Sequence, residues 1–211
     1  MASKIQIVGL CHFEDHCLKP AKKEIKIYIN KYFEGNYKKA NENEFSVFLE
    51  VNYKLQDLID EISKIKNPND AKTYFKRSSE LKGISFFPGC YSIPLLAAQV
   101  YEKPIKFYAI DKDAIKSSEL HFLAQARAGK NQELALKKAS EIDLEREKTM
   151  YDKLKESKYA LLFIGKDHLG KGSYFENKNM DFKIICHKPS MEYISLYKEI
   201  KQKTRKEKYG F

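Results

Sequence analysis

The chain has 211 residues, enough for one domain to bury a core without disulfide or metal staples. Hydrophobic residues make up 43% of it, which excludes general disorder, and no apolar run approaches the length of a membrane span. The net charge is +10, but only four of the 39 basic residues are arginine, so we do not expect a protein dedicated to nucleic acid.

The N-terminus and the cysteines bear on the cellular compartment. The first residues contain no continuous apolar segment of the kind that a secretory signal requires. The four cysteines include no Cys-x-x-Cys pair, and free thiols are expected in a reducing compartment. We therefore expect a cytoplasmic protein without a membrane span.

Apolar runs of a few residues predict buried strands, and apolar residues that repeat every three or four positions predict amphipathic helices. Glycine, proline and asparagine mark the turns between them. In chain order, we expect a strand at 5–8, a helix after Pro20, a strand at 45–49, helices over 52–65 and 68–81, a short strand at 83–89, a helix from Pro94 to about 101, a strand at 105–110, helices over 111–127 and 131–157, strands at 159–164 and 182–186, and a helical tail from 190.

Strands that alternate with helices predict an α/β fold. We expect one domain over residues 1–189, with a central, mostly parallel or mixed sheet flanked by helices. Residues 190–211 form a basic C-terminal helix or tail, which we expect to be a solvated, frayed helix. Nucleic-acid binding through this tail is an alternative that a salt-dependent interaction would support.

Chemically able side chains follow four of the predicted strands. His12 ends the motif Gly-Leu-Cys-His after the first strand, and His168 ends Gly-Lys-Asp-His after the strand at 159–164. Glu50 and Asp111 follow two strands between them. Because the carboxyl ends of parallel strands share one edge, we expect these residues to meet there. We expect each glycine to allow a sharp turn, and no core packing to depend on the ring of His168.

Two imidazoles and one carboxylate can form an open metal site. His12, Glu50 and His168 would leave a position for water, and Zn²⁺, Mn²⁺ and Co²⁺ all accept this ligand set. The metal would lower the pKa of the bound water toward neutrality and so make it a nucleophile. The alternative is that these polar residues at the strand ends only cap loops.

Arg146 is the second signal for a site. It falls within the apolar stripe of the helix over 131–157, which also carries Ala139, Ile142 and Met150. A charged residue on a buried face needs a partner, and Asp111 or Glu50 would serve. The alternative is that the arginine extends from the edge of the stripe to water.

These motifs, in their order and separation, resemble those of the TraB/PrgY family and, more widely, of the Tiki-like and erythromycin-esterase-like superfamily. Members share two Gly-x-x-His motifs, a glutamate that ends an early strand, an Ile-Asp-basic-Asp motif and a Glu-Arg pair. The resemblance runs over about residues 4–175 and is carried by residues 9–12, 45–50, 108–113, 145–150 and 161–170.

The resemblance implies a metal-dependent peptidase, because the Tiki-like branch is described in that way. It would assign His12, Glu50 and His168 to metal binding or catalysis. TraB/PrgY relatives are linked to the inhibition of peptide pheromone signalling, and other relatives of the superfamily bind haem or resemble esterases.

We therefore expect a metal-dependent hydrolase of the TraB/Tiki-like type that acts on a peptide or a small-molecule substrate. His12, Glu50 and His168 would bind the Zn²⁺, Mn²⁺ or Co²⁺ ion. If Glu50 does not bind the metal, it would act as general base. Asp111 and Arg146 would hold the metal ligands in place. The alternative is a non-catalytic protein of the same fold that binds a peptide or a small ligand such as haem. The oligomeric state is left open.

Overall fold

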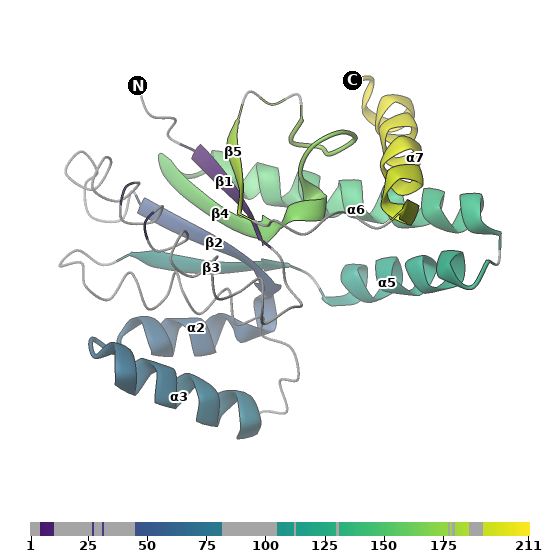
Figure 1. The fold of residues 1–211 in the computed structure, drawn as a ribbon. Coiled ribbons are helices and arrows are strands. Elements are labelled where there is room, and N and C mark those ends of the chain that lie inside the picture. Colours follow the sequence, from purple (N-terminus) through teal and green to yellow (C-terminus); the bar gives the residue numbers. More distant parts are fainter. Residues whose placement is uncertain are drawn as a thin grey trace.

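A parallel β-sheet lies at the centre of the structure, a computed structural model that describes residues 5–10, 27, 31, 45–81, 105–111, 113–129, 131–176, 178, 180–185 and 192–211 (Figure 1). Of the helix predicted after Pro20, only residues 27 and 31 are described, both as helical. The helix predicted from Pro94, the strand predicted at 83–89, and His12 lie outside the described residues.

The sheet has five strands in the described part of the chain, in the order β3-β2-β4-β1-β5. Every neighbouring pair is parallel, so the predicted α/β class is confirmed. The central strand β4 is buried along its whole length because it is covered on both faces and both sides. The strands are β1 (Ile5–Leu10), β2 (Phe45–Asn52), β3 (Lys106–Asp111), β4 (Tyr159–Gly165) and β5 (Asp181–Ile185).

The helices begin and end within a few residues of the predicted positions. Asn52 caps the first of them, because its Oδ1 accepts a hydrogen bond from the Lys54 N–H at 2.9 Å. The helical elements are η1 (Tyr53–Leu55), α2 (Gln56–Ser63), α3 (Pro68–Leu81), α5 (Asp113–Arg127), α6 (Gln132–Lys155), η2 (Lys166–His168) and α7 (Glu192–Tyr209). None of the helices in the described ranges is both long and apolar enough to cross a membrane.

Helix α6 joins two parts of the hydrophobic core. Its 24 residues span about 36 Å, longer than any strand of the sheet. Met150 and Leu154, near its C-terminal end, pack on the sheet together with Ile7 and Leu162. Its N-terminal half packs instead between α5 and α7, through Ala135, Leu136, Ala139, Ala126, Tyr197 and Ile200. The middle of α6 therefore lies between these two apolar clusters, beside the carboxyl ends of the strands (Figure 1).

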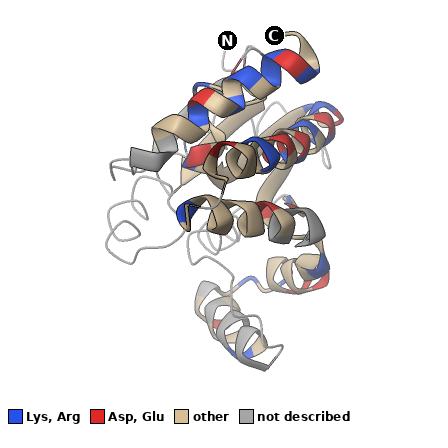
Figure 2. Ribbon diagram, turned by 90° about the vertical axis from the view of Figure 1, so that its right-hand side faces the viewer, with Lys and Arg blue, Asp and Glu red and all other residues tan. Residues whose placement is uncertain are grey.

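The prediction of a solvated, frayed C-terminal helix is wrong. Lysine and arginine do occur along α7, the helix nearest the C label in Figure 2. Two of them nevertheless point inward, since Lys201 and Arg205 are only 1% and 2% exposed. Tyr197 and Ile200 lie on the same face and join the apolar cluster with α6. Helix α7 is therefore held by packing and by buried charge, and its other lysines face solvent.

Candidate functional site

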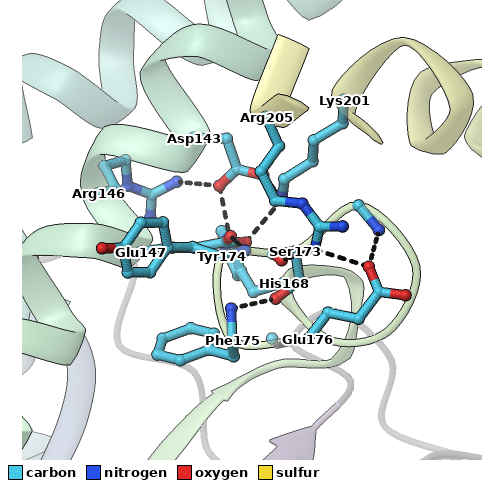
Figure 3. A network of polar contacts seen from close by, with 12 residues as sticks. Asp143, Arg146, Glu147, His168, Ser173, Tyr174, Phe175, Glu176, Lys201 and Arg205 are labelled. Carbon is cyan, nitrogen blue, oxygen red and sulfur yellow. Dashed lines mark hydrogen bonds and ion pairs between the residues drawn. The ribbon is translucent and has the colours of Figure 1, made fainter. Parts of the chain in front are cut away.

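Eight buried ionisable side chains gather beside the carboxyl ends of β2, β3 and β4. Figure 3 shows five of them, from α6, η2 and α7. They come from six elements that are distant in the sequence. We term them the charge network; its members are Glu50, Asp111, Glu119, Asp143, Arg146, Glu147, His168 and Lys201. With all eight ionised, five negative charges face three positive ones, so the network carries a net charge of −2.

Arg146 connects the strands to the helices. It binds Asp111 in a bidentate manner, with Nε to Oδ1 and Nη2 to Oδ2 both at 3.0 Å. Its Nη2 also donates to Glu50 Oε1 at 3.0 Å, and its Nη1 donates to Glu119 Oε2. The side chain is 3% exposed. The prediction that Arg146 faces inward and pairs with a carboxylate is therefore confirmed, with Asp111 and Glu50 among its partners.

His168 lies at the centre of the network. Its Nε2 contacts Glu50 Oε1 at 3.2 Å, and its Nδ1 lies 2.7 Å from Asp143 Oδ1 and 3.3 Å from Glu147 Oε1. The residue is 9% exposed. The expectation that no core packing depends on its ring is wrong, because η2 folds the ring inward from the strand end, where it is buried among three carboxylates. His168 is therefore tied to the fold.

Burial and charge act in opposite directions on the pKa values of the network. Burial would lower the pKa of His168, but the charges of Asp143 and Glu50 raise it well above its ordinary value. Burial would raise the pKa of Asp143, but the charges of His168, Lys201 and Arg146 lower it. In this state His168 is therefore an imidazolium ion and Asp143 is a carboxylate.

Glu119 has a different balance. Burial and the charge of Asp143 raise its pKa to about 7, although Arg146 opposes them. A carboxyl group with this pKa exchanges its proton near neutral pH. Glu119 is therefore the member of the network whose charge changes most readily under ordinary conditions.

Helix α7 supplies a further cation to the network. Lys201 Nζ donates to Glu147 Oε1 at 2.6 Å and to Asp143 Oδ2. Four residues later, Arg205 Nη1 donates to Ser173 O at 2.6 Å and to Glu176 Oε2 at 2.7 Å. Through these contacts α7 holds both the acids of α6 and the turn that follows η2 (Figure 3).

Three residues of the network present metal-ligating atoms to one another. Nitrogen and oxygen atoms of Asp143, Glu147 and His168 all lie within 4.8 Å of one another. Asp143 Oδ1 forms ion-pair contacts with His168 Nδ1 at 2.7 Å and with Arg146 Nη1 at 3.7 Å, although neither has the geometry of a regular hydrogen bond. A buried carboxylate oxygen is costly unless a donor or a cation satisfies it, and both of these contacts come from cationic groups. One histidine nitrogen and two carboxylate oxygens are ligands that Zn²⁺, Mn²⁺ and Co²⁺ accept.

The structure brings together Glu50, Asp111, Arg146 and His168, four of the five residues singled out from the sequence. His12 lies outside the described residues, but β1 ends at Leu10, which is paired with Gly165 at the same edge. Both oxygens of Glu50 accept hydrogen bonds, Oε2 from the Gly165 N–H at 2.7 Å. Glu50 thus orients His168; its role as a metal ligand or general base stays a prediction.

The two motif glycines do not make the sharp turns that were expected. Gly165 has a φ of −58°, which any residue can adopt, and Gly9 lies inside β1. A Cβ atom at Gly9 would lie 2.8 Å from Leu169 Cδ1 and 3.2 Å from Lys166 Cα. Gly9 is therefore needed for the close approach of η2, which carries His168.

Sequence reasoning missed Asp143, Glu147, Glu119 and Lys201. A signal for the first two was present, because at about 100° per residue they fall on the same helical stripe as Ala139, Met150 and Leu154. A polar residue on an apolar stripe indicates a buried partner. In α7, Lys201 likewise follows Tyr197 by four residues.

No family model, curated protein or solved structure matches the chain. The site is accordingly argued from its own geometry.

Proposed function

We propose that the chain is a metal-dependent hydrolase whose metal ion is held by Asp143, Glu147 and His168. The observation that carries the proposal is the gathering of one ligating atom from each of these three buried side chains within 4.8 Å of one another. A divalent cation would also offset the excess of acidic over basic groups in the network, which has five carboxyl side chains and three basic ones.

The residues around this trio fit the same purpose. Metal-ligating histidines commonly use one ring nitrogen for the metal and donate the other to a carboxylate. The contact between His168 Nε2 and Glu50 Oε1 at 3.2 Å has this arrangement, and it leaves Nδ1 facing Asp143 and Glu147. Arg146 holds Glu50 in turn, at 3.0 Å. Glu50 and Arg146 are thus positioning residues in this proposal, and Asp111 supports Arg146.

A metal bound here would supply an activated water and a Lewis acid for hydrolysis. Among the chain's own groups, Glu119 has the pKa of about 7 that suits a residue exchanging protons with a reacting group. The choice of a peptide as substrate rests on the resemblance to the TraB/PrgY family and the Tiki-like branch.

The first test measures the binding of Zn²⁺, Mn²⁺ and Co²⁺ by calorimetry and by thermal melting. We expect one ion per chain and a rise in melting temperature for the wild type. Because the ion must displace the proton on His168 Nδ1, binding should release a proton and strengthen as the pH rises. Asp143→Asn should abolish binding. The matched control is Asp152→Asn, since Asp152 is an acid on the same helix with a side chain 46% exposed.

The second test is activity. The metal-loaded protein should cleave members of a peptide library. It should lose this activity when a chelator removes the metal and regain it when metal is restored. His12→Ala tests whether His12 is a further ligand. If it is, the variant should still bind one ion per chain through Asp143, Glu147 and His168, but with lower affinity. The proposal fails if wild-type protein binds none of the three ions, or if Asp143→Asn binds them as tightly.

A non-catalytic binding protein of the same fold is the second candidate, and Lys201 favours it. Its ammonium group already neutralises Asp143 and Glu147, at 2.6 Å from Glu147 Oε1. In that case the network is a structural ion cluster. Lys201→Met would then destabilise the protein without changing the effect of metal ions on its melting temperature. In the hydrolase, by contrast, Lys201→Met should alter metal affinity, because two of the candidate ligands lose their neighbouring cation.

A further inference from the structure

Three aromatic rings from three separate segments surround the ammonium group of Lys178. Its Nζ lies 3.9 Å from the ring centroid of Phe211, 4.8 Å from that of Tyr174 and 5.6 Å from that of Tyr151. Tyr151 belongs to α6, Tyr174 follows η2, and Phe211 follows α7. We term these three rings the aromatic cage.

The rings of the cage support one another without help from the lysine. Tyr174 packs edge to face against Tyr151 and Phe211, with both pairs of centroids 5.7 Å apart. Tyr209 packs against Tyr174 from another side at 5.2 Å. Tyr174 is 6% exposed and its N–H donates to Glu147 Oε2 at 2.7 Å, so the central ring is fixed by the fold. The cage should therefore persist when its occupant leaves.

The resident lysine fits the cage by charge but not by hydrogen bonding. Among the residues that the structure describes, Lys178 Nζ has no ion pair and no hydrogen bond, only the three ring contacts. A primary ammonium has three N–H donors, which ring faces satisfy poorly. A quaternary ammonium keeps the charge and has no N–H to satisfy, which is why aromatic cages suit it. Lys178, Tyr151 and Phe211 are half-buried, so the occupant can exchange through the surface.

We propose that the aromatic cage is a binding site for quaternary ammonium groups, and that Lys178 is an internal occupant which such a ligand displaces. None of the cage residues is a proposed metal ligand, although the Tyr174 N–H is hydrogen bonded to one of those ligands, Glu147. The test of the cage needs no catalytic activity. The ligand class is a trimethylammonium group, whether carried by a free choline-type molecule or by a trimethylated lysine side chain.

The probe is tetramethylammonium, titrated into the full chain while the aromatic carbon–proton signals are followed by NMR. Lys178→Ala removes the ammonium group that contacts all three rings, while Lys155 Nζ stays 4.7 Å from the Tyr151 ring and Arg205 Cζ stays 5.8 Å from the Phe211 ring. We expect saturable shifts of the cage rings in that variant. If Lys178 fills the cage in about nine of ten wild-type molecules, wild-type affinity should be about tenfold weaker. The control is Lys158→Ala, because Lys158 Nζ lies 5.8 Å from the ring of Tyr159, which is not part of the cage. That variant should bind as the wild type does.

The rings are tested in the Lys178→Ala background. Phe211→Ala removes the ring nearest the cation and should abolish binding, whereas Phe211→Tyr should retain it; circular dichroism establishes that each variant is folded. A neutral isostere, 3,3-dimethylbutanol, should not bind. Choline and Nα-acetyl-trimethyllysine should shift the same rings, and the tighter of the two indicates the source. The proposal is overturned if tetramethylammonium leaves the cage signals of Lys178→Ala unchanged, or if the neutral isostere binds equally well.

Discussion

At the scale of single residues, Arg146 has the most consequential position in the molecule. Its guanidinium group contacts Glu50 on β2, Asp111 on β3 and Glu119 on α5, and so joins the strand ends to the helices beyond them. The charges of these carboxylates raise its pKa further, although burial opposes them. Removing such a group leaves several buried carboxylates without their common partner, which costs far more than losing a surface ion pair.

Arg146→Ala should therefore lower the free energy of unfolding by about 3–5 kcal/mol in urea titrations. Arg146→Lys should cost less, because it keeps the charge but loses the bidentate contact with Asp111. The control is Lys148→Ala on the same helix, whose side chain is 47% exposed and whose loss should cost under about 1 kcal/mol. An Arg146→Ala protein that melts like the wild type would contradict the buried network.

Glu119 gives the network a dependence on pH. Because its folded pKa of about 7 exceeds its ordinary value of 4.5, the folded state binds this proton more tightly than the unfolded state does. Its contribution to stability is therefore largest below about pH 4.5, falls as the pH rises, and is lost above about pH 7.

Glu119→Gln keeps a neutral side chain at this position and should remove that dependence. The unfolding free energy of the wild type, relative to the variant, should fall on the order of 3 kcal/mol between pH 4.5 and pH 8. Urea titrations at several pH values measure this difference. The exposed Glu133 provides the control, and Glu133→Gln should change the free energy of unfolding by less than about 0.5 kcal/mol. A flat difference for Glu119→Gln would show that this carboxyl titrates normally.

At the scale of elements, the placement of His168 depends on how closely η2 approaches β1. The first residue of that helical turn, Lys166, has its Cα 3.2 Å from the position of a Cβ at Gly9. A backbone atom cannot turn away as a side chain does, so a Cβ at position 9 should push the segment that carries His168 away by a few tenths of an ångström.

Gly9→Ala should consequently cost about 1–3 kcal/mol of stability and shift the imidazole signals of His168 in NMR spectra. In the proposed hydrolase the same change should weaken metal binding, because the histidine moves away from Asp143 and Glu147. If both the stability and the His168 signals are unchanged, the close approach of η2 to β1 is not needed for stability or for the position of His168.

At the scale of the whole molecule, α7 closes the charge network from outside the sheet. Lys201 reaches Asp143 and Glu147, and Arg205 reaches Ser173 and Glu176. A Cβ atom at Gly172, whose φ is +90°, would lie 2.9 Å from Lys198 O, so the 170–176 turn touches α7 backbone to backbone. The C-terminal helix is thus part of the site's construction.

Lys201→Met should destabilise the protein by about 3–5 kcal/mol, because it leaves two buried carboxylates short of a cation. Lys203→Met, on the exposed side of the same helix, should change stability by less than about 0.5 kcal/mol. The two variants therefore distinguish a helix packed on the protein from a solvated basic tail. In a solvated tail, both substitutions would have the same small effect on stability.

The local pattern of the sequence was enough to predict the α/β class and most described elements. Apolar runs ended by polar residues marked β1 to β5, and helical periodicity with asparagine, proline and glycine marked the helices. Because parallel strands share one carboxyl edge, the positions of Glu50 and Asp111 at strand ends placed them near each other. Arg146 stood out because a charge interrupts an apolar stripe.

Only the tertiary structure decided which charges meet. Asp143 and Glu147 lie on a helix rich in charged residues, and Lys201 and Arg205 lie in a basic tail, where most such residues face solvent. Lys201 pairs with Asp143 and Glu147, which lie 58 and 54 positions earlier in the sequence. These contacts depend on how the two helices pack. Local periodicity carries no information about that distance, since ion pairing is a property of side chains brought together by the core. The sequence by itself thus determined the elements and the strand-end residues, whereas the packing of α6 against η2 and α7 determined which charged groups surround His168.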